Sequence, residues 1–234
     1  MWMDRILFRY KKYRIPDICK KNFLLLFSYN FVLIWKSVNC SLFTASLNVL
    51  LILVIIFFKE SKIFLFSKII FFSNILMFPF ITCLEETAHG GVIIGKGKGN
   101  SLENLIIGYQ TIFNVPLIFN HAGISFQTCE LKKKDILEIL CGGPIFTIIT
   151  SFLLLIFTHS DKLYFAFLLI PTLSMAPLKV LNTDGSKIYR IFKETKPSKL
   201  LMLLWIIESN ILIIKSFFLI FSKKGNETCQ STKH

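Results

Sequence analysis

Long apolar runs separated by short polar segments dominate the chain. A helix that crosses a bilayer needs about 20 largely apolar residues. Runs close to that length cover residues 41–58, 63–83, 139–157, 163–181 and 200–221. The pattern therefore predicts an all-α integral membrane protein with about five transmembrane helices.

Two segments depart from that pattern. The apolar run 23–35 is too short to cross a bilayer and is typical of a segment in the membrane interface. Segment 90–134 is rich in glycine and holds only short apolar pieces, which predicts a small cytoplasmic hairpin of loops or strands. We divide the chain into a basic tail with the interfacial segment (1–40), an accessory transmembrane helix (41–62), a core of three spans and the hairpin (63–190), and a last transmembrane helix with its tail (191–234).

The composition supports a membrane protein and changes how the charge is interpreted. Of the 234 residues, 53% are hydrophobic and 18% are charged, whereas a soluble domain has about 25% charged residues. The 15% of aromatic residues excludes a disordered chain. The net charge of +13 would suit a nucleic-acid partner, but in so apolar a chain basic loops at a membrane surface explain it better. We expect no nucleic-acid partner.

The basic residues also predict an orientation, because cytoplasmic loops carry an excess of Lys and Arg. The N-terminal tail and segments 90–135 and 184–199 hold most of these residues and are predicted to be cytoplasmic. Segments 59–62 and 158–162 and the C-terminal tail are then predicted to be outside. The sequence thus predicts a multi-pass protein of the cell membrane with a cytoplasmic N-terminus.

The densest cluster of polar residues stands where the second apolar run ends, at Glu85, Glu86 and His89. On a helix Glu85 and His89 are four residues apart and share one face. This is the layout of the HExxH zinc motif, with Glu in the first position. Glutamate is an accepted zinc ligand. Taken alone, the cluster also fits a solvated, charged helix end.

Two further motifs lie at the same predicted end of the membrane. The fourth apolar run leads into Asn182-Thr183-Asp184-Gly185, and the third begins near Gly143-Pro144. Asp184 would supply a third ligand, and three protein ligands plus water form an open catalytic zinc site. Each motif alone also fits a simpler role, since Asn, Asp and Gly favour turns and Pro is tolerated near a helix start.

The order of these motifs resembles the site-2 protease family of intramembrane zinc metallopeptidases. The chain has EETAH at 85–89, CGGPIFT at 141–147 and NTDG at 182–185. The resemblance implies that the core 63–190 is a metallopeptidase core and that one Zn²⁺ per chain is bound. It implies these roles for individual residues: Glu85, His89 and Asp184 as metal ligands, Glu86 as the general base, and Gly143, Pro144, Asn182 and Gly185 in support.

The expected function is hydrolysis of a peptide bond in a membrane-associated peptide or protein, as in peptide maturation. The segment 90–134 would present the substrate as an extended strand, because a scissile bond inside a helix is not accessible to attack. Two alternatives stay open. One is a catalytically inactive relative that acts as a membrane partner in peptide export or immunity. The other is a small transporter subunit with Glu85, Glu86 and Asp184 in an ion pathway. Assembly into a homo-oligomer is also open.

Overall fold

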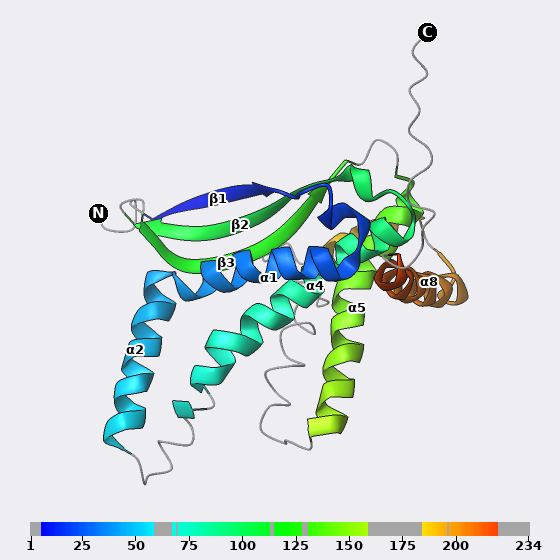
Figure 1. Ribbon diagram of the computed structural model, residues 1–234. Helices are drawn as coiled ribbons and strands as arrows, with labels where there is room; N and C mark the ends of the chain where they lie inside the picture. The colour runs from blue at the N-terminus through cyan, green and yellow to red at the C-terminus, as the bar shows by residue number, and fades with distance from the viewer. Residues whose placement is uncertain are drawn as a thin grey trace.

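The computed structural model describes residues 6–58, 67–68, 70–112, 115–127, 131–158, 184–195 and 197–219. These residues are mostly helical, with one small sheet (Figure 1). The strands are β1 (Ile6–Arg14), β2 (Leu102–Ile112) and β3 (Val115–Phe126). The α-helices are α1 (Phe23–Asn39), α2 (Leu42–Phe57), α4 (Phe78–Gly95), α5 (Lys133–Thr158), α7 (Asp184–Thr195) and α8 (Lys199–Phe218). A π-helical turn, η3 (Ser73–Met77), precedes α4, and short 3-10 turns are η2 (Cys19–Lys21) and η4 (Gly99–Ser101).

The sheet is antiparallel, with the strand order β1-β2-β3. The predicted hairpin is confirmed as β2 and β3. The sequence did not predict its third strand, which the basic tail supplies by pairing Ile6 with Ile112 through Arg14 with Asn104. A basic segment has weak strand signals of its own, and pairing with β2 is what makes it a strand. The fold is therefore not purely helical.

The helix that carries the Glu-Glu-His cluster is longer than predicted. We expected the helical pattern to break at Gly90, but α4 continues to Gly95. Glycine weakens a helix by about 1 kcal/mol relative to alanine, and here its lack of a side chain permits close packing. A Cβ at Gly91 would lie 2.9 Å from the ring of Phe23, and one at Gly95 would overlap the backbone of Leu212.

Helix α5 also differs from expectation at its start. It begins at Lys133, well before the predicted residue 139, so Pro144 lies inside the helix and not near its first turn. Polar residues occupy the added turns and form ion pairs with neighbouring elements. Lys96 just after α4 pairs with Asp135 at 2.7 Å and with the buried Glu138.

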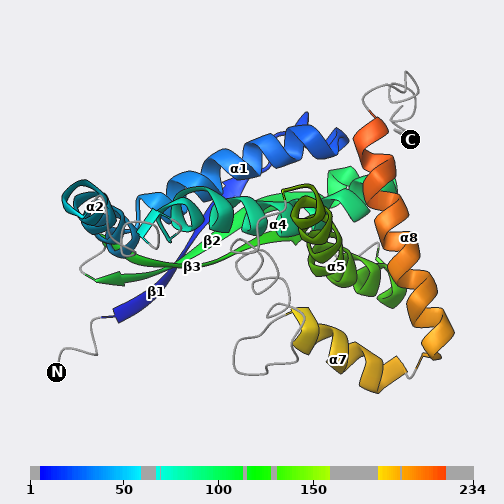
Figure 2. The same ribbon diagram turned by 90° about the horizontal axis from the view of Figure 1, so that it is seen from below.

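Three described helices are long and apolar enough to cross a membrane: 70–95, 133–153 and 199–218. Helices α1 and α2 meet at a bend of 74°, and they would make a fourth span only if the two were counted together as one broken span. The predicted span 163–181 lies outside the described residues, so five spans stay a prediction. In Figure 1, α2, α4 and α5 extend to the same side of the sheet, whereas α8 crosses α5, as Figure 2 also shows.

Helix α4 is at the centre of the fold, because α1, α5, α8 and β3 all pack against it (Figure 2). The largest core cluster includes Phe23 of α1, which stacks on Phe217 of α8 with ring centroids 4.0 Å apart. The side chain of Asn22 caps α1 by accepting from Leu24 N at 2.7 Å and donates to Ser216 O and Phe217 O in α8. This packing holds α4 between α1, α5, α8 and β3.

Candidate metal centre

Glu85 and His89 lie one turn apart in α4, and both are buried, with 6% of their surface exposed. The four-residue spacing places them on one face, as the sequence predicted. Buried ionisable groups need partners of opposite charge, hydrogen bonds or a metal ion. These two residues are therefore the first part of a site and not a solvated helix end.

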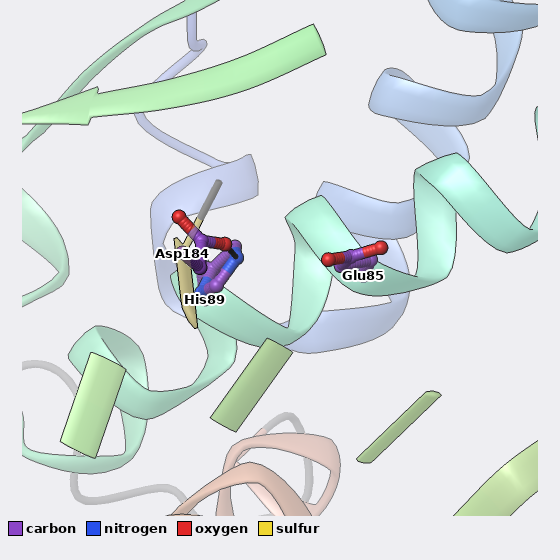
Figure 3. Close-up of side chains that lie close together, drawn as sticks. All are labelled: Glu85, His89 and Asp184. Carbon is purple, nitrogen blue, oxygen red and sulfur yellow. Dashed lines mark ion pairs between the residues drawn. The ribbon is translucent and has the colours of Figure 1, made fainter. Parts of the chain in front are cut away.

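Asp184 joins them from the first turn of α7. Its Oδ2 lies 3.0 Å from Nε2 of His89. The apolar side of α7 holds the helix in place, because Ile188 packs with Leu137 and Leu140 of α5. A residue distant in sequence thereby lies against His89, as Figure 3 shows for the side chains.

The three side chains satisfy the first requirement of a metal site. Their ligand atoms all lie within 4.8 Å of one another. Two ligands on one tetrahedral zinc ion at about 2.0–2.2 Å would be separated by about 3.4 Å. His89 and Asp184, at 3.0 Å, are close to that separation. Glu85 lies on the adjoining turn of α4 (Figure 3), and its ligand atom lies within 4.8 Å of those of His89 and Asp184.

A hydrogen bond determines which nitrogen of His89 faces the site. Nδ1 lies 2.6 Å from the carbonyl oxygen of Ile139 in α5. A carbonyl can only accept, so Nδ1 carries a hydrogen and Nε2 is the nitrogen turned toward Asp184. Metal-binding histidines usually donate their second N–H to such a group, which fixes the ring orientation.

Gly143 provides the space that the imidazole occupies. A Cβ at this position would overlap the ring of His89, so only glycine fits there without movement. The hydroxyl of Thr147 donates to Gly143 O at 2.9 Å. The sequence predicted a supporting role for Gly143 but not this contact. Pro144 lies next to it inside α5, Gly185 is buried beside Asp184, and Asn182 lies outside the described residues.

Glu86 contacts a different neighbour, the backbone of β3. Its Oε2 accepts a hydrogen bond from the backbone N–H of Ile124 in β3 at 3.1 Å. It also lies near enough to His89 and Asp184 to interact electrostatically with both. The sequence predicted Glu86 beside the metal ligands, but nothing in it indicated the contact with β3.

Lys187 is a site residue that the sequence reasoning missed. Its Nζ lies 2.9 Å from Oδ1 of Asp184, one helical turn away. Burial alone would raise the pKa of Asp184, but the charge and hydrogen bond of His89, together with Lys187, hold that pKa below its usual range. His89 and Lys187 thus balance the charge of the Asp184 carboxylate. The three-residue spacing on a short helix was the available signal.

His121 does not join the cluster. It is exposed on β3, pairs with Gly108 across the sheet, and its ring meets Tyr10 edge-on at 5.6 Å. Within the described ranges, Glu85, His89 and Asp184 are the only group of three His, Cys, Asp or Glu residues placed to hold a metal ion.

Comparison of the chain with protein-family models, curated proteins and solved structures finds no match. The resemblance to the site-2 protease family therefore remains a prediction from the motifs and their order. What the structure adds is the proximity of three potential ligands, drawn from two separate segments, in a largely buried position.

Proposed function

We propose that the protein is a membrane-embedded zinc metallopeptidase that hydrolyses a peptide bond in a membrane-associated peptide or protein. The observation that carries the proposal is the convergence of Glu85, His89 and Asp184, with ligand atoms within 4.8 Å. The Glu-Glu-x-x-His spacing, the glycine under the imidazole and the bond from Nδ1 to Ile139 O support it. We further propose a multi-pass location in the cell membrane with a cytoplasmic N-terminus.

The chemistry follows from the residues of the site. A bound zinc ion would supply a water molecule of lowered pKa and polarise the scissile carbonyl. Glu86 is the base of the proposed mechanism: its carboxylate takes the proton of the attacking water and delivers it to the leaving amine. The position of Glu86 suits this role. It follows Glu85 in the sequence, but its carboxylate accepts a hydrogen bond from β3 and is not one of the three proposed metal ligands.

The outer edge of β3 supports the proposal that the substrate binds in an extended form. Within the part of the chain that the structure describes, the order β1-β2-β3 gives β3 a partner strand on one side only. The N–H of Ile124 points from that edge to Glu86, so a peptide added along β3 would pass beside the base. Such pairing would supply the backbone hydrogen bonds that hold a substrate segment in extended form.

Metal analysis of the purified full chain is the first test. We expect about one zinc per chain, lost in Glu85→Ala, His89→Ala and Asp184→Ala. His121→Ala removes a histidine outside the cluster and serves as the matched control, which should keep its zinc. A chain that never binds zinc would refute the proposal and favour the transporter alternative, in which the same acidic residues serve an ion pathway.

Cleavage of membrane-anchored reporter peptides in the same bilayer is the second test. Glu86→Gln should keep zinc and lower the cleavage rate by about 10²–10⁴-fold, the usual contribution of a general base. Zinc binding without any cleavage that depends on Glu86 would instead favour the inactive relative that acts as a membrane partner.

A further inference from the structure

A cavity of about 190 Å³ lies between the sheet and the C-terminal half of α1, and it shares no residue with the metal centre. Lys11 and Tyr13 of β1, Tyr109 of β2, and Lys36 and Ser37 of α1 contribute to its walls. Since a water molecule takes about 30 Å³ in the liquid, the cavity has room for a phosphate group and its ester oxygens.

Two lysines and three hydroxyl-bearing residues supply the polar part of the walls of this cavity. Among the residues that the structure describes, no acidic side chain lines the cavity. Lys11 Nζ lies over the ring of Tyr109, 5.7 Å from the ring centroid. Among the described residues no ion pair involves Lys11 or Lys36, whereas Lys20, Lys96 and Lys134 all have acidic partners. Two neighbouring cations with no counter-charge favour an anionic ligand.

The hydroxyl groups of the cavity lie close to one another. Tyr109 and Ser37 are both buried, and the side chains of Ser37 and Tyr13 lie near enough to the Tyr109 hydroxyl to interact with it. Side chains that burial already restricts lose little further freedom when a ligand binds, which lowers the entropic cost of binding.

The position of the cavity indicates which anion it takes. At the end of α1 the chain turns by 74° into α2. Helix α2 exposes large apolar side chains along its length, including Phe43, Leu50 and Phe57. It extends away from the sheet in the same direction as α4 and α5 (Figure 1). The cavity thus lies where a polar layer meets an apolar surface, as a lipid headgroup does.

We propose that this cavity binds the phosphate of an anionic membrane phospholipid, with Lys11 and Lys36 as its counter-charges and the acyl chains along α2. Neighbouring residues on a strand point to opposite faces, so Lys12 lies on the other face of β1 and takes no part. The site is independent of the metal centre and of the proposed peptidase activity.

Lipid binding to the purified full chain in detergent, followed by native mass spectrometry, tests the site. We expect one phosphatidylglycerol per chain, bound at least tenfold more weakly by Lys11→Gln/Lys36→Gln and retained by Lys11→Arg/Lys36→Arg. The matched control is Lys12→Gln/Lys193→Gln, which removes the same charge from two exposed positions and should bind like the wild type. Equal weakening in both glutamine pairs would overturn the proposal, because it would mean a general charge effect.

Two further arms keep the test decisive. Leu33→Trp fills the cavity from α1 while leaving both lysines in place, and it should weaken phosphatidylglycerol binding tenfold. Unchanged binding in this variant would overturn the site. Glycerol phosphate, which lacks acyl chains, should not displace the lipid at equal concentration. Displacement by it would overturn the lipid assignment in favour of a soluble phosphate ester.

Discussion

Replacing Gly143 by alanine tests the geometry of the metal centre most directly. A Cβ at this position would lie 2.7 Å from Nδ1 of His89 and closer still to Cε1 and Nε2, whereas ordinary contact begins at 3.4 Å. The imidazole must therefore retreat by at least about 0.7 Å, which exceeds the tolerance of about 0.2 Å in a metal–ligand distance.

The movement would also disrupt the hydrogen bond that orients the ring. Nδ1 of His89 now lies 2.6 Å from Ile139 O, and loss of such a bond alone weakens metal binding by about 10–100-fold. With both effects combined we expect zinc affinity to fall at least about 100-fold, or about 2.8 kcal/mol at 1.4 kcal/mol per tenfold change.

Competition with a chelator of known affinity measures the zinc dissociation constant of the full chain. Gly142→Ala is the matched control, because its Cβ would lie 2.7 Å from Val92 Cγ2 and its three nearest atoms include none of His89. Both variants overpack the same helix, at a cost of about 1–3 kcal/mol, but only Gly143→Ala should lose zinc. Equal zinc affinity in the two variants would refute the assignment of Gly143 as the space for the imidazole.

Three other perturbations have expected outcomes that follow from the structure. Glu138→Gln should destabilise the protein by about 3–5 kcal/mol in thermal unfolding, because it leaves two lysines beside a fully buried position. Glu194→Gln, which breaks an exposed pair of 3.3 Å, should cost no more than about 1 kcal/mol, and similar losses would contradict this reasoning. Asn22→Ala should cost about 1–3 kcal/mol and expose the end of α8 to faster hydrogen exchange, since the side chain contacts both helices; unchanged exchange there would argue against it. Zinc at 100 times its dissociation constant should stabilise the wild type by about 2.7 kcal/mol and leave the stability of His89→Ala unchanged, whereas stabilisation of both would place the zinc elsewhere.

The parts of the site that could be predicted are those governed by local spacing. Glu85 and His89 share a face because a helix repeats every 3.6 residues, and this needs no knowledge of the rest of the chain. The short pieces of segment 90–134 similarly predicted a strand hairpin. The predicted end of the preceding helix at Gly90 was wrong, because Gly90 and Gly91 weaken a helix in isolation but suit one that is closely packed.

Other parts of the site depend on neighbours that are distant in sequence. Glu86 has its hydrogen bond only because β3 lies along α4, and the Gly143 backbone has its role only because the His89 ring fills the space beside it. Lys11 faces the cavity only because the basic tail pairs with β2 as a third strand. None of these contacts has a periodic signal within one segment.

By itself, the sequence determined that the chain is built from long apolar helices with basic connecting segments. The length of an apolar run and the distribution of charge along the chain can both be read directly from the order of the residues. It also placed two potential ligands on one helical turn. Only the tertiary structure decided that Asp184 lies 3.0 Å from His89, that Gly143 leaves room for the imidazole, and that the N-terminal tail completes a sheet above α1. These arrangements arise from packing between segments far apart in the chain, where side-chain volume and hydrogen-bond partners, not local periodicity, determine position.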